Sequence, residues 1–572
     1  MSYPVVMSLD HTLASHHRGN TFLGFGACLP GRLTQEAFFR AVAWPAATAL
    51  PDGSIGTADC GSRRIEAALR EAGFGPRDFH FAHPDRLGEA VGPDTKVFLF
   101  GSHDPLGRGP LARMFHALWG GPPPFNARSV ARLLFHPALK KARPVVIAGG
   151  GGAWEWATDE RARRDFGVDC VLVGEGETTV PELVRRALDG ETLPEVVTGR
   201  TVPVDRIPRL RSPTAGGVVE ATRGCGRGCH FCVPNLLKLR SLPVEHVLED
   251  VAVNLRAGRR RVSLHAEDIF RYGNTGGFAV NEEAVCGLFE AVARQDGVEM
   301  VSASHATLAG ALAAPSLLRR LAGILGLGRP GRPEAGAFQI GIETGSVSMA
   351  RRHLAQKMAP FSADDWPEVV RQGAAHLWAN RFYAAYTLVV GLPGETDADV
   401  YDTLRLVRQL RGIPCVIFPL FFVPMSPVWT GQEQPLTASQ VTRAQAELIV
   451  AAFEHNAQWA DRVWALYGRA ASSTYAVVAR AMVRALTAMM TRSARRLAME
   501  RGSEAGRREP GTALHGAVSS AAPDRGDIFQ PLRRGRAEWF PPVPSPPSQP
   551  LPQVSQGTGV GCPLPAPRIP AN

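Results

Sequence analysis

Three cysteines, Cys225, Cys229 and Cys232, lie in one short stretch and are separated by four and then three positions. Thiols at this spacing can bind three corners of a cubane iron–sulfur cluster, which leaves its fourth iron without a protein ligand. A metal with an open coordination position can take up an exchangeable ligand, as catalytic zinc does, so the pattern indicates chemistry rather than structure. A zinc site is the alternative, but it normally uses paired C-x-x-C units and a fourth ligand such as His230, and no second pair lies nearby.

The composition is that of a globular protein with room for two or three domains, since 45% of its 572 residues are hydrophobic. The amino-terminal residues lack the successive charged, apolar and small-residue phases of a signal peptide, and no uncharged apolar run reaches the length of a membrane helix. We therefore expect a cytoplasmic protein without a membrane span. Nine cysteines are too few for a disulfide scaffold in so long a chain, and three so close together indicate metal binding in a reducing compartment.

The net charge of +10 raises the question of a nucleic-acid partner. Residues 491–572 contain 11 Arg against 6 Asp or Glu, so about half of the excess positive charge lies in the carboxyl-terminal segment. A lone basic cluster such as Arg259-Arg260-Arg261 is more typical of a solvated helix end than of a phosphate-binding patch. The charge distribution therefore does not favour nucleic acid as a partner.

The amino-terminal part predicts an open parallel α/β sheet. Residues 1–60, rich in Gly, Ala and turn formers, are expected to form an arm, and residues 61–205 a Rossmann-like domain. Within that domain, apolar runs at 96–100, 145–148 and 170–173 each end in a Gly-rich turn before a helix-like segment. This repeat is typical of a doubly wound sheet, whose ligands bind at the carboxyl ends of the strands.

A connector rich in Pro and Arg at 203–213 separates this domain from a second one at 215–430. The first strand of the second domain, at 218–222, runs directly into the cysteine stretch. Apolar runs that alternate with helix-like segments predict further strands at 261–264, 299–302, 338–342, 385–390 and 416–423. Six strands alternating with helices fit an open, partial (β/α)6 barrel, in which the loops at the carboxyl ends of the strands form the active site.

Two segments beyond the barrel differ in composition. Residues 438–500 are helical in pattern and are expected to cap the barrel, with a partner-binding module as the alternative. Residues 503–572 form a tail with 11 prolines between 541 and 572, and this composition predicts a disordered segment.

The cysteine stretch, placed directly after the first barrel strand and with Phe231 before its last cysteine, resembles the signature of the radical S-adenosylmethionine superfamily. Residues 341–346 (GIETGS) and 389–396 (VVGLPGET) are similar to the fourth- and fifth-strand segments of its elongator-like members. The resemblance covers roughly residues 215–430. It implies that the three cysteines hold a [4Fe-4S] cluster whose open iron binds the amine and carboxylate of S-adenosylmethionine. An external one-electron donor such as ferredoxin or flavodoxin would then drive cleavage to a 5′-deoxyadenosyl radical.

The resemblance also implies roles for residues at the ends of the barrel strands. The second strand ends in Ala-Glu-Asp rather than the Gly-Gly-Glu of many relatives, and Glu267 or Asp268 is expected to bind the methionyl amine. Glu343 is expected to reach the ribose or the carboxylate, with a buried structural network as the alternative. His305 lies at a strand end and is expected to face the substrate, so His305 and Glu267 are the predicted catalytic residues. Further predicted cofactor-binding residues of the barrel are Thr344, Ser346 and Gly391.

The amino-terminal sheet resembles the cobalamin-binding domain of cobalamin-dependent radical enzymes in this superfamily. Its loops at 148–151 (AGGG) and 173–178 (VGEGET) are similar to loops of that domain, where glycines let the corrin ring approach the backbone. The D-x-H-x-x-G motif that supplies an imidazole to cobalt is absent, because Asp104 stands where the histidine would be, a departure that many members share. A domain that only packs on the barrel is the alternative. The predicted cobalamin-binding residues are Ser102, Asp104, Gly107, Gly149, Gly150, Gly174, Glu175 and Gly176.

These features predict a radical S-adenosylmethionine enzyme, and the first hypothesis is a cobalamin-dependent methyltransferase that acts on an unactivated carbon. The second is an enzyme of the same architecture that performs a cyclisation, oxidation or rearrangement without methyl transfer. A methylthiotransferase is a weaker alternative, because Cys28, Cys60 and Cys170 are too dispersed to supply the additional cluster that such enzymes carry. A non-catalytic iron–sulfur sensor or scaffold is the alternative from a different class. No recognisable nucleotide, lipid or peptide motif in the barrel loops indicates the substrate.

Overall fold

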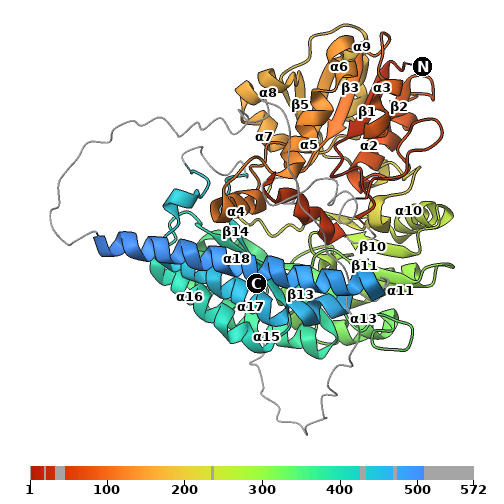
Figure 1. The fold of residues 1–572 in the computed structure, drawn as a ribbon. Coiled ribbons are helices and arrows are strands. Elements are labelled where there is room, and N and C mark those ends of the chain that lie inside the picture. The colour runs from red at the N-terminus through yellow and green to blue at the C-terminus, as the bar shows by residue number, and fades with distance from the viewer. Residues whose placement is uncertain are drawn as a thin grey trace.

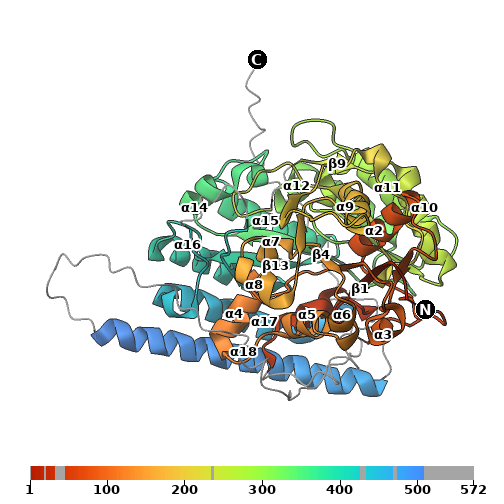
Figure 2. The ribbon, with the colours of Figure 1, turned by 90° about the horizontal axis from the view of Figure 1, so that it is seen from above.

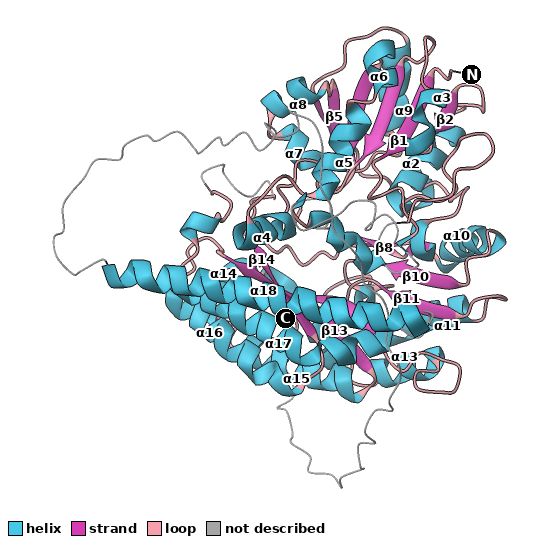
Figure 3. Cartoon of the chain, viewed as in Figure 1, coloured by secondary structure: helices cyan, strands magenta, loops and turns pink. Residues whose placement is uncertain are grey.

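The computed structural model describes residues 2–17, 21–31, 45–233, 238–425, 433–467 and 473–507. An amino-terminal α/β unit is followed by a second α/β unit with two three-stranded sheets and by two long helices (Figures 1 and 3). The α/β fold class predicted from the sequence is confirmed. Most of the predicted disordered tail, residues 508–572, lies outside the described residues.

The amino-terminal sheet is parallel throughout and has the strand order β2-β1-β3-β4-β5-β6. Its strands are β1 (Val5–Leu9), β2 (Phe79–Phe81), β3 (Val97–Gly101), β4 (Val145–Gly149), β5 (Cys170–Val173) and β6 (Val196–Thr198). The helices of this unit are α2 (Cys60–Glu71), α3 (Leu87–Ala90), α4 (Pro110–Trp119), α5 (Phe125–Leu134), α6 (Pro137–Ala142), α7 (Ala153–Ala157), α8 (Glu160–Phe166) and α9 (Thr179–Leu188). Figure 2 shows this unit from above.

Helices cover both faces of this sheet. Successive side chains of a strand point to opposite faces, so Val5 and Val6 of β1 belong to different hydrophobic clusters. The cluster of Val5 includes Leu69 of α2, whereas the cluster of Val6 includes Trp156 of α7. The sheet is therefore doubly wound, as the repeat of strand, turn and helix predicts.

Strand β1 corrects the boundary predicted for this unit. Residues 1–60 are predicted to be an arm, but Val5–Leu9 pairs with both β2 and β3 inside the sheet. A five-residue run with four apolar residues, followed by polar and turn-forming residues, carries too little periodicity to identify a strand from sequence. Strand β2 lies on one side of β1, and β3 and the later strands lie on the other, so the strand order reverses at β1. The carboxyl ends of β1 and β3 therefore flank the topological switch point, where sheets of this order bind ligands.

The second unit has six parallel strands in two sheets, ordered β11-β10-β7 and β12-β13-β14. A parallel bridge between His305 and Gln339 links β11 to β12 and makes the six strands a partial barrel. The strands are β7 (Val218–Glu220), β10 (Arg261–His265), β11 (Met300–Ala303), β12 (Gly336–Glu343), β13 (Phe382–Val390) and β14 (Val416–Phe421). The helices are α10 (Val244–Arg256), α11 (Glu282–Ala293), α12 (Leu308–Ala313), α13 (Leu317–Leu325), α14 (Val347–His353), α15 (Trp366–Ala379) and α16 (Asp397–Gln409).

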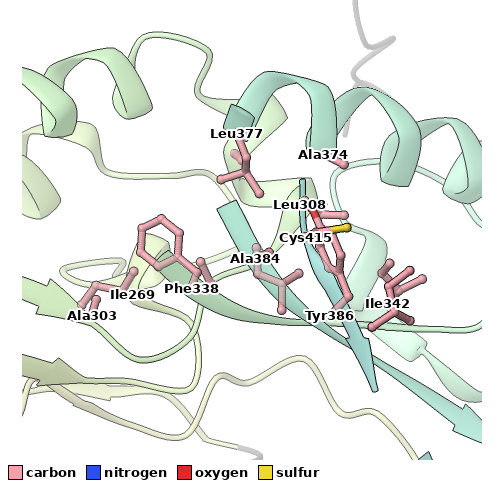
Figure 4. Close-up of a cluster of buried hydrophobic side chains, with 14 of the residues drawn as sticks. Ile269, Ala303, Leu308, Phe338, Ile342, Ala374, Leu377, Ala384, Tyr386 and Cys415 are labelled. Carbon is pink, nitrogen blue, oxygen red and sulfur yellow. The ribbon is translucent and has the colours of Figure 1, made fainter. Parts of the chain in front are cut away.

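The barrel core lies between the strands and the outer helices. Figure 4 shows Phe338, Ala384 and Tyr386 of neighbouring strands together with Ala374 and Leu377 of α15. These side chains are buried, and they hold the strands at a fixed distance from the helix layer.

The carboxyl-terminal region consists of α17 (Arg443–Tyr467) and α18 (Ser473–Arg507). Helix α17 packs against β14, and α18 packs against α17 and crosses the molecule in Figure 1. The indole Nε1 of Trp119 in α4 donates a hydrogen bond of 2.9 Å to Ser493 Oγ, so α18 also contacts the amino-terminal unit. In the described part of the chain, every helix is too short or too polar to cross a membrane.

Candidate active site

The three cysteines lie in a loop whose two ends are joined by a short antiparallel ladder. Strand β8 (Thr222–Arg223) follows β7 directly and pairs with β9 (Arg240–Ser241), with Arg223 opposite Arg240. We call residues 224–239 the cluster loop and the β8–β9 ladder its neck; residues 234–237 are outside the described residues. The loop therefore begins at the carboxyl end of the first barrel strand, where the sequence places it.

The thiols of the cluster loop are close enough to influence one another; Cys229 is buried, and Cys225 and Cys232 are partly buried. Burial raises the pKa of all three, to about 11 for Cys229 and about 12 for Cys232, and Cys225 contributes to both increases. The thiol of Cys229 also donates a hydrogen bond of 3.3 Å to the carbonyl oxygen of Leu354. Because the thiolate is the metal-binding form, thiols in this setting ionise on binding a metal cation.

The donor set fits an iron–sulfur cluster. Within the described residues, no three His, Cys, Asp or Glu side chains are arranged to hold a metal ion. The thiolates of a cubane bind three different iron atoms, so they need not converge on one point. The cluster loop supplies three thiols and no fourth, and the ammonium group of Lys357 lies near enough to lower the pKa of all three. Cys225, Cys229 and Cys232 are the residues that would hold the cluster.

Arg227, inside the cluster loop, anchors the loop to the barrel. Its guanidinium donates to Asp268 Oδ2 from Nε (3.1 Å) and Nη2 (2.9 Å), and both side chains are almost fully buried. Nη1 donates to the carbonyl oxygens of Gln356 and Lys357 at 2.9 and 3.1 Å. Thr307 at the start of α12 donates to the same oxygen of Asp268. Asp268 thus holds the cluster loop in place through its ion pair with Arg227. Its contact with S-adenosylmethionine stays a prediction.

Glu343 is held at the end of β12 by a buried ion pair. Its Oε1 lies 2.7 Å from Lys357 Nζ, and its Oε2 accepts a hydrogen bond of 3.3 Å from Thr387. A Cβ on Gly341 would lie 1.7 Å from Glu343 Oε1 and 2.5 Å from Lys357 Nζ, so a larger residue there would force these side-chain ends to shift. The backbone of Glu343 has a φ of 67° next to a register shift in the β12–β13 ladder. Strain of this kind is concentrated at functional sites.

The ends of β10 and β11 bring the two predicted catalytic residues to the same side of the barrel. His305 Nδ1 lies 3.2 Å from the carbonyl oxygen of Ala266, and burial lowers the pKa of His305 to about 4, so its imidazole is neutral at pH 7. Burial raises the pKa of Glu267, and its Oε2 has no hydrogen-bond partner. A buried carboxylate oxygen without a partner is costly unless a ligand satisfies it. Oδ1 of Asp268 also lacks a hydrogen-bond partner, so both carboxylates fit a ligand-binding role, and Asp268 is in addition bound by Arg227 through its other oxygen.

Thr344 and Ser346 are buried against α16. The hydroxyl of Ser346 donates a hydrogen bond of 2.5 Å to Asp399, and Thr344 Oγ1 lies 3.1 Å from Thr403 Oγ1. These partners leave the two hydroxyls engaged within the protein, and contact with a cofactor stays a prediction for both. Gly391 follows β13 with a φ of 84°, and its amide donates to Glu395 Oε2 at 2.9 Å.

The predicted cobalamin-binding residues lie at the carboxyl ends of β3, β4 and β5. Asp104 is buried, and its carboxylate accepts hydrogen bonds from the amide of Gly109 (2.8 Å) and from Asn126 Nδ2 (2.9 Å). The hydroxyl of Ser102, at the switch point, is buried and has no hydrogen-bond partner. A Cβ on Gly150 would lie 2.7 Å from the carbonyl oxygen of Ser102, so this glycine lets the β3 and β4 loops approach closely. The other predicted glycines, Gly107, Gly149, Gly174 and Gly176, lie in the same set of loops.

Glu175 connects the two units. It follows β5, and its Oε2 lies 3.1 Å from Nη1 of both Arg223 and Arg240 at the neck of the cluster loop. Its neighbour Glu177 also pairs with Arg223. The carboxyl edge of the amino-terminal sheet therefore faces the cluster loop, with Glu175 bound to protein arginines.

The amino-terminal cysteines lie in separate surroundings. The charges of Asp104 and Glu155 contribute to the pKa of Cys28, and the charge of Arg64 contributes to the pKa of Cys60. Cys170 lies in β5. Burial raises the pKa of each thiol. Among the described residues of this unit, no three His, Cys, Asp or Glu side chains are arranged to hold a metal ion.

Sequence reasoning missed four basic residues of the site, which are Arg223, Arg227, Arg240 and Lys357. Arg223 lies two positions before Cys225 and Arg227 two positions after it. This proximity to the cysteines is the sequence feature that could have identified them as site residues. Lys357 lies 14 residues after Glu343, and no local pattern connects the two.

The sequence is similar to curated enzymes that carry the name tRNA-2-methylthio-N(6)-dimethylallyladenosine synthase. The enzyme of Desulfosudis oleivorans is 26% identical over 51% of this chain and 59% of its own length. That of Magnetococcus marinus is 27% identical over 53% of this chain and 66% of its own length, and that of Vibrio cholerae is 24% identical over 48% and 55%. The chain thus spans less than two thirds of the length of each of these relatives.

Among solved structures, two of the radical S-adenosylmethionine methyltransferase TsrM from Kitasatospora setae are similar. One has cobalamin and a [4Fe-4S] cluster bound, with a TM-score of 0.44, and the other has tryptophan and an S-adenosylmethionine analogue bound, with a TM-score of 0.46. Each is 12% identical to this chain. The matched region is 74% of this chain in both cases, and it is 74% of the first solved chain and 75% of the second.

No protein-family model matches the sequence. The family assignment depends instead on the three-cysteine loop after the first strand of a partial six-stranded barrel and on the match to the enzymes above. On these grounds the chain belongs to the radical S-adenosylmethionine superfamily.

Proposed function

We propose that this chain is a methyltransferase that cleaves S-adenosylmethionine in the barrel and binds cobalamin at the carboxyl edge of the amino-terminal sheet. When bound, the [4Fe-4S] cluster supplies the electron that yields a 5′-deoxyadenosyl radical, and cobalamin supplies the methyl group for an unactivated carbon. The contact of Glu175 with Arg223 is the main support for the proposal. It places the carboxyl edge of the amino-terminal sheet, which contains the topological switch point, next to the cluster loop.

The residues of the barrel have complementary roles in this proposal. Cys225, Cys229 and Cys232 bind iron, while Arg227 and Asp268 fix the loop that carries them. Glu267, with its unpartnered oxygen, binds the methionyl amine, and His305 lies at the neighbouring strand end toward the substrate. These groups are buried or only partly exposed, which limits the access of water to the reacting atoms.

The test begins with protein reconstituted anaerobically with iron and sulfide. With a strong one-electron reductant and S-adenosylmethionine, we expect 5′-deoxyadenosine by liquid chromatography, and we expect cobalamin to be retained after desalting. Cys229→Ala should abolish 5′-deoxyadenosine, whereas Cys286→Ala, a buried cysteine of α11 outside the site, should keep it. Absence of 5′-deoxyadenosine from the unchanged protein would refute radical chemistry. Its formation without cobalamin retention would favour an enzyme of this superfamily that does not methylate.

A second candidate function is transfer of a methylthio group to a tRNA base, and the names of the sequence relatives favour it. The separate surroundings of Cys28, Cys60 and Cys170 favour the methyltransferase instead, because a methylthiotransferase needs an additional cluster in this unit. Incubation with tRNA that contains N(6)-dimethylallyladenosine, followed by mass spectrometry of the nucleosides, separates the two candidates. A methylthio gain would overturn the proposal and the expectation that nucleic acid is not a partner.

A further inference from the structure

The neck of the cluster loop brings two like charges together. Arg223 and Arg240 are directly opposite each other in the β8–β9 ladder, and each side chain is only 11% exposed. Like charges at directly opposed positions destabilise an antiparallel pair, and burial removes the water that would screen them. The ladder has only two residue pairs, so it has little other support. Closure of the neck therefore needs a negative charge between the arginines.

Glu175 supplies that charge from the amino-terminal unit. Its Oε2 accepts from Nη1 of both arginines at 3.1 Å, its Oε1 pairs with Nη2 of Arg240, and the amide of Val202 donates to it at 2.9 Å. Burial alone would raise the pKa of Glu175, but Arg240 and Arg223 outweigh that effect and lower it. Glu175 is thus ionised and bridges both ends of the loop.

The two arginines depend on Glu175 to different degrees. Arg223 also pairs with Glu177 and with Glu220, and Glu220 in turn lies 3.4 Å from the buried Arg64 of α2. Arg240 pairs with Glu175 and donates a hydrogen bond of 2.6 Å to the carbonyl oxygen of Val202, while its Nε has no hydrogen-bond partner. Loss of the Glu175 charge should therefore release the β9 side of the neck before the β8 side.

We propose that Glu175 is a positioning residue that closes the neck of the cluster loop from the amino-terminal unit, so that docking of this unit holds the iron-binding thiols in place. This assigns Glu175 to the loop instead of to cobalamin. The inference rests on the cluster-binding role of the loop within the proposed function, and it does not require methyl transfer.

Hydrogen exchange of the full chain without iron gives the first test. Glu175→Gln keeps the size of the side chain and removes its charge, and Glu182→Gln in α9 is the matched control, because Glu182 pairs with Arg200 on the surface. We expect at least about tenfold faster exchange at the neck in Glu175→Gln, above all at the amide of Leu242, which donates to Ala221 across the neck. Exchange equal to that of Glu182→Gln would overturn the proposal.

Iron retention gives the second test and uses neither S-adenosylmethionine nor substrate. In reconstituted protein, Glu175→Gln should lose iron to a chelator about 10- to 100-fold faster than Glu182→Gln, as when other supports of metal ligands are removed. Should Glu175→Gln not fold, Arg240→Met and Arg240→Lys replace it: the first should lose iron quickly, and the second, which keeps the charge, should retain it better. Equal rates of iron loss in the two variants compared, Glu175→Gln with Glu182→Gln or Arg240→Met with Arg240→Lys, would overturn the proposal. Failure of the unchanged protein to bind iron would instead refute the proposed function, while the exchange test would still stand.

Discussion

Lys357 Nζ and Glu343 Oε1 form a buried ion pair at 2.7 Å beside the cluster loop. Burial alone would lower the pKa of Lys357, but Glu343 and the nearby Cys229 raise it, so the ammonium stays charged. The same ammonium opposes the burial that raises the pKa of Cys225, Cys229 and Cys232. Lys357 therefore links the strained end of β12 to the thiols of the cluster loop.

Lys357→Met should destabilise the protein strongly, because Glu343 would remain as a buried charge without its partner. Breaking a buried pair in this way costs about 3–5 kcal/mol of the unfolding free energy. The double variant Lys357→Met/Glu343→Leu, which removes both charges, should recover part of that loss. Arg351→Gln is the control, since Arg351 pairs with Asp364 on the surface and should change stability by less than about 1 kcal/mol. Chemical denaturation measures all three, and equal losses in Lys357→Met and the control would contradict the assignment.

Gly341→Ala tests the space that the pair requires. The added methyl group would overlap Glu343 Oε1 at 1.7 Å and should displace the carboxylate, with a loss of about 1–3 kcal/mol from overpacking. Gly287→Ala, on the exposed face of α11 with no atom within 4 Å of the new methyl, should instead stabilise by about 0.5–1 kcal/mol. Thermal or chemical unfolding should therefore give effects of opposite sign, and a neutral Gly341→Ala would show that the carboxylate can move.

Asp268→Asn and Glu267→Gln should separate loop support from ligand binding. Asp268→Asn leaves the guanidinium of Arg227 buried without its counter-charge, so a loss of about 3–5 kcal/mol is expected. Glu267→Gln should cost little stability, because burial already raises the pKa of this carboxyl. Its expected effect is on S-adenosylmethionine, measured as weaker binding by equilibrium dialysis with reconstituted protein. Unchanged binding in Glu267→Gln would remove this residue from the site.

Local patterns predicted the features that are local in the fold. The spacing of Cys225, Cys229 and Cys232 and the apolar runs before Gly-rich turns are readable in short windows, and the structure has the loop at the end of β7 and six barrel strands. Strand β12 extends slightly beyond the predicted 338–342, to Gly336–Glu343, since small and polar residues at strand ends carry no clear signal.

The charge partners were not predictable from sequence, because tertiary packing sets them. Arg223 and Glu175 are 48 positions apart, and Arg227 and Asp268 are 41 apart. Ser346 is predicted to bind a cofactor, and that contact stays a prediction; its hydroxyl donates to Asp399 of α16, a partner that no periodicity connects to it. Strand β1 was missed because a five-residue segment with four apolar residues does not reveal a neighbour that lies some 70 to 90 residues later in the chain.

Glu395 should make the stability of the protein depend on pH. Burial, with further contributions from Asp399 and Asp397, raises the pKa of Glu395 to about 7, although Gln445 and the amide of Gly391 donate hydrogen bonds to it. Between its ordinary pKa of 4.5 and about 7, the folded protein holds a proton that the unfolded chain has released. The unfolding free energy should therefore fall as pH rises through this window, by an amount on the order of 3 kcal/mol.

Glu395→Gln should flatten this dependence, because the amide cannot ionise and can still accept from Gly391. Denaturation between pH 5 and pH 8 should show the variant gaining stability over the unchanged protein only toward the upper end. Glu182→Gln, on the surface, should keep the slope of the unchanged protein. Parallel curves for the unchanged protein and Glu395→Gln would mean that Glu395 is ionised when buried, so that its two hydrogen bonds outweigh desolvation.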